Sequence, residues 1–133
     1  MRLTQRDYDK LDQIDERLDA VVELASEICK VPFCVVDGLR TLERQKELYA
    51  KGRTKPGKIV TWTLNSEHLS GRAVDLAPLN ELRKIDWEDI DGFKEIMRAM
   101  KEAAKELKVD IECGGEWTKH VDLPHFQLRK GTK

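Results

Sequence analysis

The first group of residues that could carry out chemistry contains a histidine and an aspartate seven positions apart. His68 lies in a segment typical of a loop, and Asp75 lies in a short apolar segment between Val74 and Leu76. A carboxylate in such surroundings is costly to bury unless it is paired or bound to a metal. Because successive strand residues point to opposite faces, we expect Asp75 to face a surface cleft that His68 reaches from its loop.

A second group follows near the end of the chain, where Asp122 precedes His125 by three residues and Pro124 stiffens the backbone between them. His68, Asp75 and His125 together supply two imidazoles and one carboxylate. This is the donor set of an open catalytic zinc site, in which water fills the fourth position. Zinc lowers the pKa of that water toward about 7. Asp122 could then take its proton as a general base.

The spacing of these residues leaves simpler interpretations open. A histidine in an arbitrary domain is more often a core or surface residue than a metal ligand. Asp75 could instead cap a loop or form an ion pair with Arg40 or Arg72.

The composition is that of one ordinary domain with nearly balanced charge. The 133 residues include 24 Lys and Arg against 25 Asp and Glu, and 40% are hydrophobic. A uniformly basic nucleic-acid-binding protein and a disordered chain are thereby excluded. No apolar run approaches the roughly 20 residues that cross a bilayer, and the first ten residues lack an apolar signal core. We therefore expect no nucleic-acid partner, no membrane insertion and synthesis in the cytoplasm.

The three cysteines have the spacing of neither a disulfide framework nor a Cys-rich zinc site. Cys29 and Cys34 lie among apolar residues and are interpreted as buried, reduced side chains.

Helical and extended segments alternate irregularly along the chain. Three segments have the apolar periodicity of amphipathic helices: about 4–29, 41–51 and about 90–108. Five short segments have strand character: 32–36, 59–64, 72–77, 109–113 and 124–129. This pattern predicts an α+β fold: a single small domain over residues 1–133, with about three helices and a short, mostly antiparallel sheet.

The two groups of candidate residues resemble the motifs of a known peptidase family. The pattern S-x-H-x-x-G-x-A-x-D over residues 66–75 is followed by D-x-P-H-F over residues 122–126. These motifs are similar to those of the zinc D-alanyl-D-alanine carboxypeptidases and L-alanyl-D-glutamate endopeptidases. That family includes vancomycin-resistance carboxypeptidases and small phage endolysins. Shorter matches extend the resemblance from about residue 36 to residue 128.

The resemblance implies a role for five of these residues. One zinc ion would be bound by His68, Asp75 and His125. Asp122 would be the catalytic base, and Arg40 would bind substrate or stabilise the developing oxyanion. The structural alternative for Arg40 is an ion pair with Asp75 or Asp37.

Four further residues are candidate substrate contacts: Ser66, Arg53, Trp117 and His120. Their simpler interpretations are loop hydrogen bonding for Ser66, a solvated loop for Arg53, core packing for Trp117 and solvent exposure for His120. Glu116 is a competing candidate for the base, but the match to D-x-P-H favours Asp122.

One residue in the second motif indicates which bond is cut. The small phage endopeptidases have Asp three residues before the last histidine, as here, whereas the carboxypeptidases have Glu. We therefore predict cleavage of the L-Ala–D-Glu bond in the peptidoglycan stem peptide. The alternatives are a D-alanyl-D-alanine carboxypeptidase and a zinc-bearing binding module without catalysis.

The resemblance also implies the biological setting. It favours a phage endolysin without a separate cell-wall-binding domain or signal peptide. Such a protein would be a monomer made in the host cytoplasm, and it would reach the wall after release by a holin.

Overall fold

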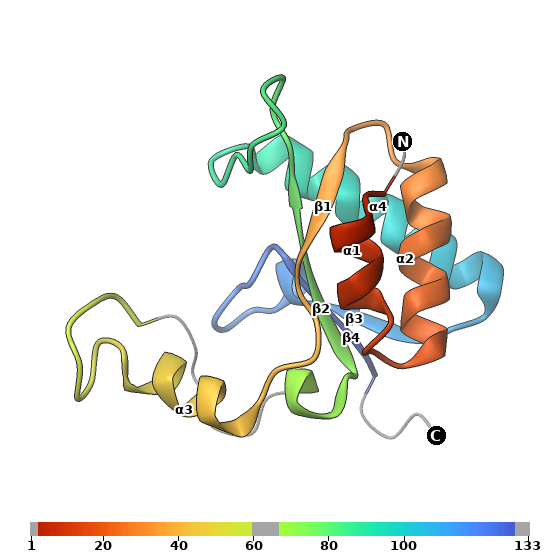
Figure 1. Ribbon diagram of the computed structural model, residues 1–133. Coiled ribbons are helices and arrows are strands. Elements are labelled where there is room, and N and C mark those ends of the chain that lie inside the picture. The colour runs from red at the N-terminus through yellow and green to blue at the C-terminus, as the bar shows by residue number, and fades with distance from the viewer. Residues whose placement is uncertain (1–2, 60–66, 130–133) are drawn as a thin grey trace.

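The computed structural model describes residues 3–59 and 67–129, and these form an α+β domain built on an antiparallel sheet (Figure 1). The sheet has the order β1-β2-β4-β3. Its strands are β1 (Phe33–Asp37), β2 (Ala73–Pro78), β3 (Ile111–Cys113) and β4 (His125–Leu128). The α-helices are α1 (Gln5–Leu11), α2 (Glu16–Ile28), α3 (Leu42–Ala50) and α4 (Ile90–Leu107), with short 3-10 turns η1 (Glu67–Ser70) and η2 (Gly114–Glu116). The predicted fold class is confirmed.

The prediction of a single helix over residues 4–29 is wrong in one respect, because the structure has two helices there, α1 and α2. Asp15 begins α2 by accepting a hydrogen bond from the backbone N–H of Arg17 at 2.9 Å. The backbone N–H of Asp15 donates to the carbonyl of Gly71 at 2.9 Å, which anchors the break against another segment. Both helices bury apolar residues in the same core, so the periodicity continues across the break.

One face of the sheet is covered by helices α2 and α4, which also pack against each other (Figure 1). Alternate strand residues point into this core, as the strand period requires. Its fully or almost fully buried members include Leu18, Val22, Val74, Leu76, Ile96, Met100, Phe126 and Leu128. The predicted apolar stripe of α4 is therefore a core surface. Helix α3 lies apart from the other helices, beyond the end of β1.

The remaining segments agree with their predicted types to within one or two residues at the ends, with two exceptions. The strand predicted over 59–64 lies outside the described residues except for residue 59. The segment around His68, predicted to be a loop, contains η1. All three cysteines are free, but Cys34 is only half-buried, which corrects its interpretation as a core residue. Among the described residues, no helix is both long enough and apolar enough to span a membrane.

Candidate active site

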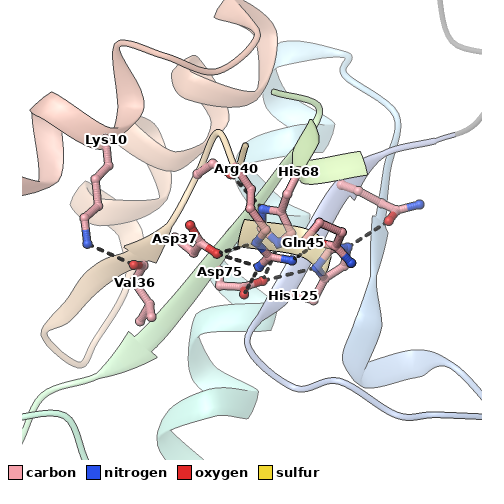
Figure 2. A network of polar contacts seen from close by, with 10 residues as sticks. Lys10, Val36, Asp37, Arg40, Gln45, His68, Asp75 and His125 are labelled. Atoms are coloured by element: carbon pink, nitrogen blue, oxygen red, sulfur yellow. Dashed lines mark hydrogen bonds and ion pairs between the residues drawn. The ribbon is translucent and has the colours of Figure 1, made fainter. Parts of the chain in front are cut away.

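His68, Asp75 and His125 meet on the sheet face that α2 and α4 leave uncovered (Figure 2). Antiparallel register pairs Asp75 of β2 directly with His125 of β4, so their side chains share a face. His68 reaches them from η1. Nε2 of His68 lies 3.2 Å and Nδ1 of His125 lies 3.1 Å from the same Oδ1 of Asp75. The potential ligand atoms of the three residues all lie within 4.8 Å of one another.

Gly71 allows η1 to carry His68 over the sheet. Its φ is +71°, and a Cβ at this position would lie 3.0 Å from the carbonyl oxygen of Gln13. Only glycine adopts this conformation in this space without strain. The carbonyl of His68 accepts a hydrogen bond from the backbone N–H of Arg40 at 2.9 Å. The histidine is therefore held between the end of β1 and the junction of α1 with α2.

Hydrogen bonds on the outer sides of the two imidazoles determine their tautomers. Nδ1 of His68 lies 2.8 Å from the carbonyl oxygen of Gly38, which can only accept, so this nitrogen donates. Nε2 of His125 lies 2.8 Å from Oε1 of Gln127. The amide nitrogen of Gln127 donates to Glu112 at 3.4 Å, which turns the amide oxygen toward His125. In the neutral state, each ring therefore directs the lone pair of its other nitrogen inward.

This arrangement fits a metal cation. Two imidazole lone pairs and the carboxylate of Asp75 converge on one point, and such a contact is unfavourable unless a proton or cation lies between the groups. Two nitrogen donors and one oxygen donor, with outer hydrogen bonds that orient the rings, make up a site that could hold a metal ion with three protein ligands.

The electrostatics of the cluster agree with this geometry. Burial alone would raise the pKa of Asp75, but hydrogen bonds from His125 and His68, with a proton on each inward-facing nitrogen, outweigh it and lower the pKa well below its ordinary value. Burial likewise would lower the pKa of His125, but Asp75 raises it. The cluster therefore holds a carboxylate in its ionised form, ready to bind a cation.

Asp122 lies half-buried beside the cluster, on the segment that leads into β4. Its backbone N–H donates to the carbonyl of Gly114 at 2.9 Å, and its carbonyl accepts from the N–H of His125 at 3.1 Å. A Cβ at Gly114 would lie 2.4 Å from the carbonyl oxygen of Asp122, so glycine permits this close packing. Burial, together with the charge of Asp75, raises the pKa of Asp122. This shift makes the carboxylate a stronger base than an exposed aspartate.

Arg40 lies next to His68 and Asp75 in the cluster (Figure 2). Its Nε donates to Asp37 at 3.0 Å and its Nη1 donates to Gln45 at 2.6 Å. Its Nη2 lies 4.0 Å from Oδ2 of Asp75. Gln45 is fully buried and the Arg40 side chain is only 9% exposed. The guanidinium therefore faces the centre of the site while structural partners fix its position.

The four candidate substrate contacts differ in their positions relative to the site. Trp117 lies beside the site, with its ring centroid 5.2 Å from that of His125. His120 is exposed at a φ of 53° and lies outside the group of metal-capable residues among the described positions. Cζ of Arg53 lies 3.9 Å from the ring centroid of Tyr49, near the end of α3, and its Nη1 donates to the carbonyl of Tyr49 at 2.6 Å. Ser66 lies outside the described residues.

Glu116, the alternative base, is exposed and pairs with Lys101 at 2.8 Å. Its carboxylate is therefore engaged at the surface of α4.

Sequence reasoning missed Gln127, which hydrogen-bonds to the outer nitrogen of His125, and Glu112, which hydrogen-bonds to Gln127. Gln127 follows His125 by two positions, so strand alternation places both on one face and could have identified it. Glu112 carried no comparable signal, because its role depends on which strands pair. The sequence did name Asp37, as a structural partner of Arg40, and the structure has this pair.

The comparisons with known proteins agree on one family. Residues 1–132 match the family model of the phage L-alanyl-D-glutamate peptidase. The L-alanyl-D-glutamate peptidase of Escherichia phage T5 is 30% identical over 126 residues, which cover 92% of this chain and 85% of that protein. The peptidoglycan L-alanyl-D-glutamate endopeptidase CwlK of Bacillus subtilis is 36% identical over 104 residues, which cover 74% of this chain and 61% of that protein.

Solved structures show the same relationship in three dimensions. The L-Ala D-Glu endopeptidase ChiX of Serratia marcescens superposes with a TM-score of 0.84 at 36% identity, covering 97% of this chain and 90% of ChiX. The vancomycin-resistance D,D-dipeptidase VanXYg, at 21% identity, shares the fold, with a TM-score of 0.56 over 86% of this chain and 50% of that chain. The protein whose site is described above belongs to the phage L-alanyl-D-glutamate peptidase family.

Proposed function

We propose that this protein is a zinc-dependent peptidoglycan hydrolase that cleaves the L-Ala–D-Glu bond of the stem peptide. The observation that carries the proposal is the convergence of two imidazole lone pairs and one carboxylate beside the half-buried Asp122. Membership of the phage L-alanyl-D-glutamate peptidase family supports the reaction, and relatives named for the same activity support the bond.

His68, Asp75 and His125 are the residues that would hold the metal. When bound, zinc would polarise the scissile carbonyl and lower the pKa of a water molecule toward about 7. The outer hydrogen bonds to Gly38 and Gln127 keep both imidazoles in the orientation that this task needs.

Asp122 is proposed as the proton carrier of the reaction. Its carboxylate would accept a proton from the attacking water and deliver it to the amine nitrogen of the departing D-Glu residue. One group can serve both steps because it lies at the edge of the cluster, with its backbone fixed by Gly114.

Arg40 is proposed to stabilise negative charge on the substrate. Asp37 and Gln45 hold its guanidinium in place before substrate arrives. A preorganised donor of this kind stabilises the tetrahedral state without a reorganisation cost at the moment of reaction. Trp117 is proposed as a wall of the substrate groove.

A single catalytic domain and a monomer are the simplest organisation that fits these features. The described residues of α1, α2, α4 and the sheet contribute to one hydrophobic core, and His68, Asp75 and His125 come together beside that same sheet. We infer that the enzyme acts on the wall after synthesis in the host cytoplasm and release through a holin-opened membrane.

Digestion of purified peptidoglycan followed by mass spectrometry of the fragments tests the proposal. New fragments with an N-terminal D-Glu are the expected result. Released D-Ala would instead establish a carboxypeptidase. Binding to peptidoglycan that is unchanged in the Asp122→Asn variant, with no cleavage by the unsubstituted protein, would establish a binding module.

A further inference from the structure

A groove with a volume of about 500 Å³ runs along the outer edge of β1, between α1 and the loop 79–85. We call it the basic groove, because four cationic side chains line it together with the thiol of Cys34: Arg6, Lys10, Arg83 and Lys84. The whole chain has a net charge of −1, so this accumulation of positive charge is local.

Two of the charged residues in the basic groove, Asp7 and Lys10, form hydrogen bonds with backbone groups of the protein itself. Asp7, which is 4% exposed, accepts hydrogen bonds from the backbone N–H groups of Val35 and Thr4, each at 2.9 Å. Nζ of Lys10 donates to the carbonyl of Val36 at 2.9 Å. These side chains cover the open edge of β1, which would otherwise present unpaired backbone groups.

The other three cations are directed to solvent. The side chains of Arg6, Arg83 and Lys84 are exposed and form no hydrogen bond or ion pair with another described residue. Arg83 and Lys84 lie on a well-defined turn, because Oδ1 of Asn80 accepts from the backbone N–H groups of Leu82 and Lys84 at 2.9 and 3.1 Å. A fixed turn presents the two charges together, which suits an anionic ligand.

The basic groove leads toward the candidate active site. Val36 lies in the groove, and the next residue, Asp37, pairs with Arg40 (Figure 2). Cys34 is opposite Ala77 on β2, so it shares a sheet face with Asp75, two residues away along that strand. Two strand residues span roughly 7 Å. A polymer seated in the active site can therefore continue into the groove.

We propose that the basic groove binds carboxylates of the peptidoglycan strand beyond the bond that is cut. The inference rests on the proposed function, because the occupant must be continuous with the substrate. Stem peptides carry several carboxylates, and their repetition along the polymer matches a cluster of cations beside the site. The groove thus adds affinity for the wall polymer that a short peptide cannot use.

Paired substitutions test the groove without touching the active site. The groove variant is Arg83→Asn with Lys84→Gln; asparagine tolerates the φ of 61° at position 83. The matched control is Lys94→Gln with Lys105→Gln, which removes the same charge from the exposed face of α4. Lys10 is kept, because it covers the strand edge.

Kinetics on two substrates give the first readout. The groove variant should raise KM on insoluble peptidoglycan by about fivefold, as two exposed ion pairs of ordinary strength would predict. Its kcat, and its activity on a short soluble stem peptide, should stay within about twofold of the parent; such a change is under 0.5 kcal/mol. An equal loss on the soluble peptide, or an equal rise of KM in the control, would overturn the proposal.

Co-sedimentation with peptidoglycan in the Asp122→Asn background gives a second readout that needs no catalysis. Amidation of the polymer's carboxylates should weaken binding of the control variant several-fold more than that of the groove variant. If amidation weakens binding of the two variants equally, the carboxylates of the polymer are bound elsewhere on the protein. Binding that survives amidation but disappears when phosphate polymers are stripped from the wall would assign the groove to phosphate. If no substrate is cleaved, the proposed function is wrong. Co-sedimentation still shows in that case whether the basic groove binds carboxylates of peptidoglycan.

Discussion

Gln127 fixes the orientation of the His125 imidazole by binding Nε2, the ring nitrogen that does not face Asp75. Its Oε1 accepts a hydrogen bond from Nε2 of His125 at 2.8 Å, and its own amide nitrogen donates to Glu112 at 3.4 Å. Both histidine and glutamine are buried, so no water competes for the bond. Nδ1 of His125 is thereby turned toward Asp75, with its lone pair available to a cation.

Replacing Gln127 by leucine should weaken zinc binding, because the imidazole loses the acceptor that orients it. Outer-shell partners of metal-binding histidines typically contribute about 10- to 100-fold in affinity. Competition against a chromophoric chelator measures the change. The double variant Gln127→Glu with Glu112→Gln keeps an acceptor toward His125 and a donor behind it, so it should recover much of the affinity. Unchanged zinc affinity in Gln127→Leu would show that the hydrogen bond has no such role.

Asp122→Asn should abolish most of the hydrolysis while the fold and the metal site persist. The amide cannot take a proton from water, and general bases contribute about 10²- to 10⁴-fold in rate. The measurements are kcat and the zinc content of the purified variant. Glu116→Gln is the matched control, because Glu116 pairs with Lys101 at the surface and should be dispensable. A comparable fall in kcat for Glu116→Gln would transfer the role of base to that residue.

Removal of the metal should lower both activity and thermal stability. A cation that binds only the folded state stabilises it by about 2.7 kcal/mol at a concentration 100 times its Kd. Without it, the lone pairs of His68 and His125 face the carboxylate of Asp75. Unfolding scans with a chelator and after addition of zinc provide the check. A Tm that is the same in both conditions would mean that the cluster does not bind zinc.

Asp19 on α2 should make stability fall as pH rises toward neutrality. Burial, together with the neighbouring Glu23, raises the pKa of Asp19 to about 7, and its Oδ1 is buried without a hydrogen-bond partner among the described residues. A pKa raised above the unfolded value means that the folded state binds the proton more tightly. The resulting stabilisation is therefore present below pH 3.8 and is lost as the pH approaches about 7.

Asp19→Asn should consequently increase the free energy of unfolding at pH 8 by about 1 kcal/mol, a value reduced for solvent screening of a half-exposed group. At pH 4 the variant and the parent should differ little. Denaturant titrations at both pH values measure this, with the exposed Glu106→Gln on α4 as control. An equal effect of Asp19→Asn at the two pH values would contradict the assignment.

Several features of this protein follow from the sequence by itself. The residue types and order of His68, Asp75, Asp122 and His125 predict a metal-donor set and a base, and the structure brings the three predicted donors together. The period of apolar residues predicts α4 and its core-facing stripe. Strand alternation predicts that Asp75 faces away from the core, as the structure has it.

Other features were decided by the tertiary structure alone. The break between α1 and α2 depends on Asp15 and its backbone bond to Gly71, while the apolar period runs on across it. The support of His125 through Gln127 and Glu112 depends on β4 lying between β2 and β3. Strand order determines which side chains meet, and a local pattern contains no information about strand order. For the same reason, only the folded chain brings α1 and the loop 79–85 together as the basic groove.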